Sequence, residues 1–97
     1  MEYMPEVIQV IPTDDFNVYV YFDDGSIKLY DASEDIKMGI FTVLQDIKKF
    51  KECCTVLNGT LAWDLEGNYD ETKCLDLDPF NIYENSPEVE EPTKLFH

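Results

Sequence analysis

A chain of 97 residues has room for a single domain with a thin core. It carries 21 acidic residues against seven lysines and no arginine, which gives a net charge of −14. Nucleic acids and anionic lipid surfaces select basic faces, so this composition excludes both as partners and favours basic proteins.

The N-terminal stretch MEYMPEVIQV lacks the positive start and the apolar run of a signal peptide. No stretch approaches the roughly 20 apolar residues of a membrane span. The cysteines, Cys53, Cys54 and Cys74, form no CxxC pair, and we expect them to be reduced thiols. The sequence therefore predicts a cytoplasmic protein that does not bind membranes.

Three runs rich in Val, Ile, Tyr and Phe open the chain, separated by the turn signals PTDD and DDG. In the middle run Val18, Val20 and Phe22 fall on one face of a strand, with Tyr19 and Tyr21 on the other. Gly25 supplies the positive φ that a tight hairpin turn requires. This pattern predicts a three-stranded antiparallel meander over residues 7–11, 17–22 and 26–30.

The period then becomes helical between Ile40 and Phe50, with Ser33 as the expected N-cap and Gly39 dividing the region into two short helices. Asn58-Gly59 predicts a second hairpin, with strands 53–57 and 60–63. Asp78-Pro79 predicts the start of a last helical turn. The expected fold class is α+β: a small antiparallel sheet, made of the meander and the second hairpin, with short helices packed on it. Residues 1–84 form the domain, and residues 85–97 form an acidic, proline-containing mobile tail.

The residue types that act in catalysis and metal binding form no recognisable site in the sequence. We therefore expect no cofactor, no bound metal and no enzymatic activity. No acidic run matches a calcium loop, and His97, the sole histidine, lies at the end of the tail. The glycines are isolated, so no phosphate-cradling loop is present. A divalent-metal-dependent hydrolase that uses Asp64, Asp76 and Asp78 stays open as a lesser alternative.

The stretch WDLEGNYDETKCLDLDPFNIYE, residues 63–84, interleaves aromatic and acidic side chains. Its aromatic residues either complete the core or form an exposed face that docks a basic protein, for which Trp and Tyr are frequent anchors. The candidate partner-binding residues are Trp63, Asp64, Asp76, Asp78 and Tyr83.

The series PEVIQVIP, FDDGSIKLYD, GIFTVLQDIKKF, GTLAWD and LDLDPFNIYE resembles the small bacterial family known as domain of unknown function 2442 (DUF2442). The resemblance covers residues 5–84. The matching positions are Phe22, Asp24, Gly25, Tyr30, Asp31, Phe41, Leu44, Phe50, Trp63, Asp76, Leu77, Pro79, Ile82 and Tyr83.

This resemblance implies a small α+β fold like the N-terminal domain of a nitrite-reductase-associated bacterial protein, and no established activity. It also implies a neighbouring gene for a second small protein, in a layout similar to toxin–antitoxin pairs. We therefore expect a non-enzymatic interaction module that binds a small, basic partner protein encoded nearby, as an antitoxin would. A small-ligand-binding or sensing domain, with a pocket between the sheet and the 40–50 helix, is the alternative. Exposed strand edges also allow a homodimer.

Overall fold

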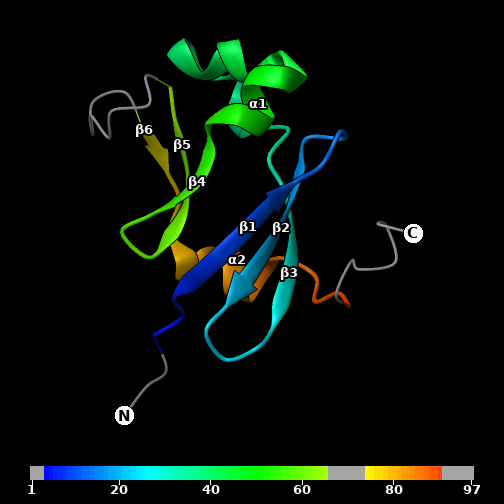
Figure 1. Ribbon diagram of the computed structural model, residues 1–97, viewed down its shortest axis with the longest axis vertical. Coiled ribbons are helices and arrows are strands. Elements are labelled where there is room, and N and C mark those ends of the chain that lie inside the picture. The colour runs from blue at the N-terminus through cyan, green and yellow to red at the C-terminus, as the bar shows by residue number, and fades with distance from the viewer. Residues whose placement is uncertain (1–3, 66–73, 91–97) are drawn as a thin grey trace.

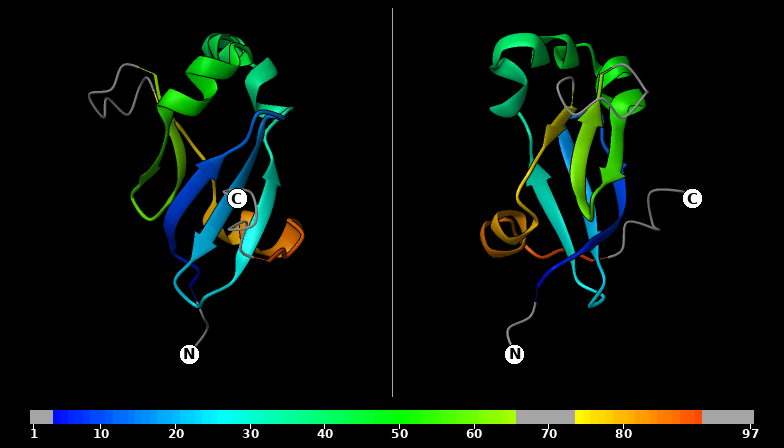
Figure 2. Two further views of the ribbon diagram at one scale, coloured as in Figure 1. Left: turned by 45° about the vertical axis from the view of Figure 1, so that its right-hand side comes forward. Right: turned by 90° about the vertical axis from the view of Figure 1, so that its left-hand side faces the viewer.

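The computed structural model describes residues 4–65 and 74–90, and it confirms the α+β class. Two antiparallel sheets, with strand orders β1-β2-β3 and β4-β5-β6, lie beside each other (Figure 1). Short helices cross one end of the molecule, and a last helix, α2, lies behind the first sheet (Figures 1 and 2).

The first sheet is the predicted meander. Its strands are β1 (Val7–Pro12), β2 (Asn17–Phe22) and β3 (Ile27–Asp31). Buried Val18, Val20 and Phe22 alternate with partly exposed residues along β2, as the period of two predicts. Gly25 takes a φ of 91° in the β2–β3 turn. A bulge in β1 at Ile8 shifts the register, so that Val7 pairs with Phe22 and Gln9 pairs with Tyr21.

The second sheet contains one strand more than the predicted hairpin. Strands β4 (Cys54–Leu57) and β5 (Thr60–Asp64) are joined by Asn58 and Gly59, whose φ angles of 53° and 75° fit the expected turn. Strand β6 (Cys74–Asp76) adds to the free edge of β5. The Val7 N–H donates to the Gly59 C=O at 2.9 Å, which places the two sheets side by side.

The predicted helical region is divided into three short pieces: η1 (Asp35–Lys37), η2 (Gly39–Gln45) and α1 (Ile47–Cys53). The expected cap at Ser33 is wrong. Asp31 accepts a hydrogen bond from the Ser33 N–H instead, and η1 has no side-chain cap. Asp46 caps α1 through the Lys48 N–H, and this cap separates α1 from η2.

Helix α2 (Pro79–Asn85) begins as predicted, with Asp78 accepting from the Phe80 N–H and Pro79 in the first turn. The sequence places the residues that follow in the tail, whereas the structure pairs them with β3. The Leu29 N–H donates to the Pro87 C=O at 3.0 Å, and the Val89 N–H donates to the Ile27 C=O at 2.9 Å. We call residues 86–90 the C-terminal strap. The rest of the predicted tail, residues 91–97 with Leu95-Phe96 and His97, lies outside the described residues.

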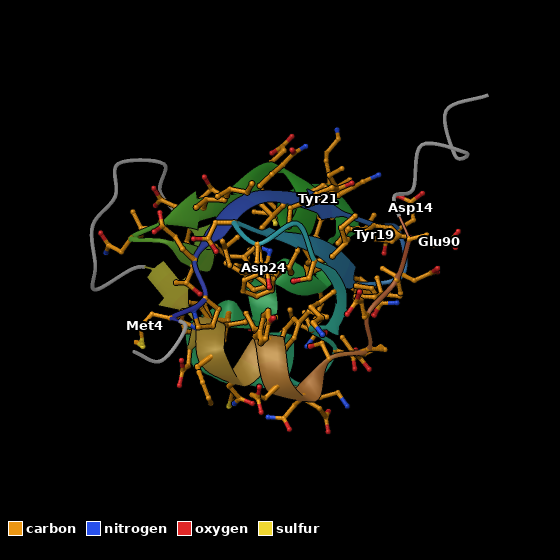
Figure 3. All side chains as sticks on the ribbon, turned by 90° about the horizontal axis from the view of Figure 1, so that it is seen from below. Met4, Asp14, Tyr19, Tyr21, Asp24 and Glu90 are labelled. Carbon is orange, nitrogen blue, oxygen red and sulfur yellow. The ribbon has the colours of Figure 1, made fainter. Side chains whose placement is uncertain are left out.

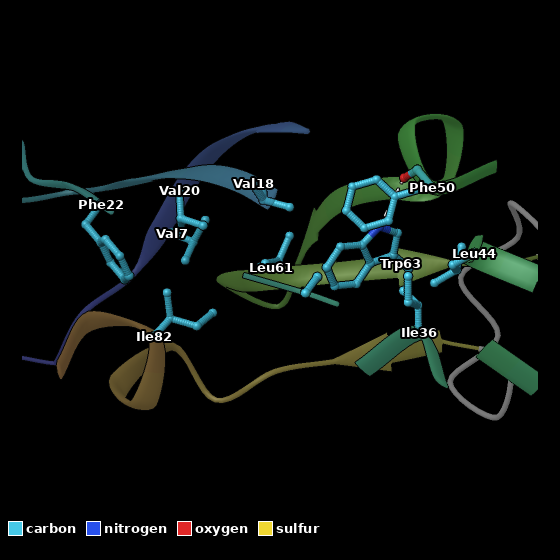
Figure 4. Packing of buried hydrophobic residues seen from close by; sticks show 11 residues of the cluster. Val7, Val18, Val20, Phe22, Ile36, Leu44, Phe50, Leu61, Trp63 and Ile82 are labelled. Atoms are coloured by element: carbon cyan, nitrogen blue, oxygen red, sulfur yellow. Dashed lines mark hydrogen bonds between the residues drawn. The ribbon is translucent and has the colours of Figure 1, made fainter. Parts of the chain in front are cut away.

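The core lies between the two sheets, α2 and the short helices (Figure 4). Trp63 of β5 stands at its centre with no exposed surface. Its ring lies 5.3 Å from the Phe50 ring, and its Nε1–H donates to the Phe50 C=O at 3.1 Å. Phe50 also contacts Phe16 edge-on, at 5.2 Å between ring centroids. The other buried apolar residues are Val7, Val18, Val20, Phe22, Ala32, Ile36, Leu44, Leu61, Ala62 and Ile82.

We predict that Trp63→Phe lowers the free energy of unfolding by about 2–4 kcal/mol, because it leaves both a cavity and an unpaired buried carbonyl at Phe50. Phe80→Leu is the matched control: Phe80 is 50% exposed, so this change should stay within about 0.5 kcal/mol. Urea unfolding followed by circular dichroism measures both. Equal midpoints for the two variants would contradict a central role for Trp63.

Candidate protein-interaction face

The five predicted partner-binding residues do not gather on one exposed face. Trp63 is fully buried, as the alternative of a core role predicts, and Asp64 is 6% exposed, so neither lies on an exposed face. Asp78 is exposed but is occupied as the cap of α2. Tyr83, half-buried on α2, faces the β2–β3 turn. The backbone of Asp76 pairs with Ala62 in the second sheet, and its side chain lies outside the described part.

Tyr83 belongs to a polar cluster at the β2–β3 turn. Its hydroxyl donates to Asp24 Oδ2 at 2.6 Å, and Ser26 Oγ donates to Asp24 Oδ1, also at 2.6 Å. The Ser26 N–H adds a third bond, at 2.9 Å. These bonds, that of the Ser26 hydroxyl first, lower the pKa of Asp24 to about 2. Lys28 Nζ lies 5.0 Å from the centroid of the Tyr83 ring. The cluster joins α2 to the first sheet, which is a structural role.

The side of the first sheet opposite α2 is the strongest candidate for a functional surface. Directly paired residues of antiparallel strands share a face. Tyr19 pairs with Ile11 and Leu29, and Tyr21 pairs with Gln9 and Ile27. None of them is among the buried residues of the chain. We call this set the outer sheet face: Gln9, Ile11, Tyr19, Tyr21, Ile27 and Leu29.

The outer sheet face is unusual in its composition. An antiparallel sheet with one face on the core normally presents polar residues on the other. Asn17 and Asp31, the next pair on the same side, are polar, as is Gln9, and the five residues between them are aliphatic or aromatic. Ile8, in the bulge beside it, is 59% exposed. Figure 3 shows Tyr19 and Tyr21 on the side of the sheet away from α2, and no helix of the described residues packs there. Its five apolar residues are partly exposed, and a contiguous apolar surface of this kind is a candidate interaction site.

The surroundings of the outer sheet face are acidic. Asp15, in the β1–β2 turn, and Asp31, at the end of β3, are exposed, as is Glu90 of the strap. The neighbouring Asp14 is also exposed, but it is ion-paired with Lys51 of α1. Hydrogen bonds from Ser33 hold the pKa of Asp31 below its usual value. The three strands contain one lysine, Lys28, and its pairing with Val20 places it on the inner face. An apolar centre with carboxylates around it fits a basic protein surface.

The sequence contained a signal for this face that the site prediction did not use. The alternation in β2 places Tyr19 and Tyr21 opposite the core residues, and that placement is correct. The prediction followed the density of acidic residues in 63–84 instead. The middle of that stretch, including Glu66, Asp70 and Glu71, lies outside the described residues.

Other chemistries have little support among the described side chains. No group of three His, Cys, Asp or Glu residues within 4–65 and 74–90 could hold a metal ion. Burial raises the pKa of the Cys54 thiol to about 12, and it also raises that of Cys53, so both resist forming the reactive thiolate. Phe50, Phe16 and Trp63 pack in the space where the ligand-binding alternative expects a pocket.

No helix in the described parts of the chain is long and apolar enough to cross a membrane.

Comparison with known proteins gives one match. The model of the family described as "Protein of unknown function (DUF2442)" matches residues 7–88, which covers both sheets, α2 and the start of the strap. No curated protein and no solved structure matches the chain.

We predict that the Asp24 cluster makes stability depend on pH below about 4. The folded pKa of about 2 lies below the ordinary 3.8, so the unfolded chain takes up the proton first as the pH falls. The stabilisation is therefore present above pH 4 and is lost toward pH 2. Asp24→Asn should lose less stability than the unchanged chain between pH 4.5 and pH 2.5 in urea titrations, with Tyr83→Phe intermediate. An equal loss of stability between pH 4.5 and pH 2.5 in the unchanged chain, Asp24→Asn and Tyr83→Phe would refute a role of the Asp24 cluster in this pH dependence.

Proposed function

Because the chain belongs to the family of proteins of unknown function DUF2442, whose description carries no activity, we propose its function from the surface it presents. It is a non-enzymatic interaction module that binds a small, basic protein through the outer sheet face. The observation that carries this proposal is the apolar, tyrosine-bearing sheet face on the side away from α2.

The tyrosines are the expected anchors of the contact. Tyr and Trp combine a large apolar area with a polar tip, and they dominate the binding energy of many protein interfaces. Tyr19 and Tyr21 lie on the central strand of the sheet, with Ile27 and Leu29 of β3 on one side and Gln9 and Ile11 of β1 on the other. A partner seated over them would exclude water from the whole outer sheet face.

Charge supports a basic partner. With a net charge of −14, the chain attracts positively charged proteins and repels further copies of itself. The carboxylates of Asp15, Asp31 and Glu90 would accelerate the encounter more than they would strengthen the complex. The contact should therefore form more slowly in high salt.

The family resemblance suggests where the partner originates. A small protein encoded beside this one is the expected partner, and binding would neutralise it as an antitoxin neutralises a toxin. We place the interaction in the cytoplasm, consistent with the free thiols of Cys53 and Cys54 among the described residues.

We predict that Tyr19→Ser combined with Tyr21→Ser weakens partner binding by about 30-fold or more, the equivalent of one interface hot spot. The test is capture from an extract of the native host, followed by titration of the captured basic protein against each purified variant. Phe80→Ser is the matched control, because Phe80 is equally apolar and 50% exposed but lies on α2.

Circular dichroism confirms that each variant is folded. If the double variant folds and still binds with unchanged affinity, the outer sheet face is not the binding surface. If the intact chain captures no basic protein, the interaction module itself is contradicted.

A further inference from the structure

The edge of β3 that faces away from β2 carries backbone N–H and C=O groups that do not bond within the three-stranded sheet. The Phe22 N–H donates to the Ser26 C=O, and the Ala32 N–H donates to the Phe16 C=O, so alternate residues of β3 bond to β2. Ile27, Leu29 and Asp31 are the residues in between, and their N–H and C=O groups point to the outer edge. An edge of this kind accepts a further strand.

The C-terminal strap fills this edge only in part. The Lys28–Glu88 bridge sets it antiparallel to β3, with Pro87 opposite Leu29 and Val89 opposite Ile27. Pro87 accepts from the Leu29 N–H but has no N–H to return to the Leu29 C=O. Helix α2 ends at Asn85, so the strap does not extend alongside Asp31. A longer strand without proline would make more hydrogen bonds than the strap does.

The strap also has little side-chain support. Pro87, Glu88 and Glu90 are exposed, and Val89 is partly exposed. The ion pair between Lys28 Nζ and Glu88 Oε1 is long, at 3.8 Å, and the Glu88 side chain is 69% exposed. The Lys28 side chain is only 12% exposed, but at this separation and with Glu88 in solvent the pair adds little stability. Local opening of the strap should therefore cost far less than unfolding of the sheet.

We infer that the edge of β3 is a strand-binding site, that the strap occupies it in the free protein, and that the basic partner adds an extended strand there when the strap leaves. This inference rests on the proposed function. The side chains of Ile27 and Leu29 belong to the outer sheet face, so an added strand would enlarge that face continuously.

The occupant is a strand of the basic partner rather than of a second copy. Asp31 flanks the part of the edge that the strap does not reach, and Glu90 ends the strap. Two copies would bring these carboxylates, and a charge of −14 each, against one another. A lysine- or arginine-bearing strand would be attracted to the same position.

Three substitutions in the full chain test the strap. Val89→Pro removes the N–H that bonds to Ile27 and should open the strap. Pro87→Val supplies an N–H opposite Leu29 and should close it. Glu90→Pro is the control, because Glu90 lies one residue past the last hydrogen bond of the strap.

Amide hydrogen exchange gives the first measurement. In the intact chain the Leu29 amide, bonded to the strap, should exchange faster than the Tyr30 amide, which faces β2. The rate at Leu29 should rise about two- to tenfold in Val89→Pro and fall by a similar factor in Pro87→Val, as expected for one backbone hydrogen bond. If Leu29 and Tyr30 exchange together in all variants, the strap does not open independently and the inference is overturned.

A synthetic peptide provides the second measurement. The peptide repeats residues 86–90 with Pro87→Val and ends in a run of lysines, and the control peptide carries Val89→Pro in addition. The first peptide should shift the Leu29 amide resonance of the Val89→Pro chain and bind it more tightly than it binds the intact chain. Absence of binding would overturn the strand site. Dimerisation of the Val89→Pro chain that excludes the peptide would assign the edge to a second copy instead.

Failure of this inference can be distinguished from failure of the proposed function. If the captured basic protein binds the Val89→Pro and Pro87→Val chains equally, the interaction module stands and the strand site falls. If no chain captures a basic protein while the exchange rates and peptide binding behave as expected, the strand site stands and the proposed function falls.

Discussion

The contact between Trp63 and Phe50 fixes α1 against the second sheet at the centre of the core. Trp63 comes from the centre of the second sheet, and Phe50 comes from α1. The indole N–H is a polar group in a dry interior, and the Phe50 carbonyl accepts its hydrogen bond there. Phe16, in the turn between β1 and β2, contacts the Phe50 ring edge-on. Its backbone takes a positive φ of 62° in this turn. Because α1 runs directly into β4, this contact and the Phe16–Phe50 contact set the orientation of the helix over both sheets.

Much of the fold could be predicted from local chemistry. Asn58-Gly59, Gly25 and Asp78-Pro79 each occur where a particular backbone geometry is required, and each takes the expected geometry. The strap and β6 could not be predicted in the same way. Each is too short to show a periodicity of its own, and the strap pairs with a strand about 60 residues earlier in the sequence.

The candidate site was harder to predict than the fold. A stretch with many acidic residues need not expose the aromatic residues between them. Trp63 and Asp64 were candidates for an exposed face because the stretch 63–84 interleaves aromatic and acidic residues. In the structure β6 makes β5 the central strand, and all its residues are buried. For Tyr19 and Tyr21 the position was predicted correctly, because the alternation along β2 places them opposite the core. They were not chosen as site residues, because alternating strands are common and do not by themselves indicate a binding site. Only the strand pairing shows that Trp63 and Asp64 lie on a buried central strand, whereas Tyr19 and Tyr21 lie on a sheet face that no second layer covers among the described residues.

The bond between Tyr83 and Asp24 has a consequence for synthesis on the ribosome. It joins residues 59 positions apart, so the helix that covers Val20 and Phe22 leaves the ribosome long after the hairpin that carries them. At bacterial and eukaryotic elongation rates, that delay is roughly 3–12 s. Until α2 and the strap emerge, the inner face of the meander is accessible and the outer edge of β3 is unpaired. The nascent chain therefore passes through a stage in which chaperones have access to a surface that the finished protein keeps buried.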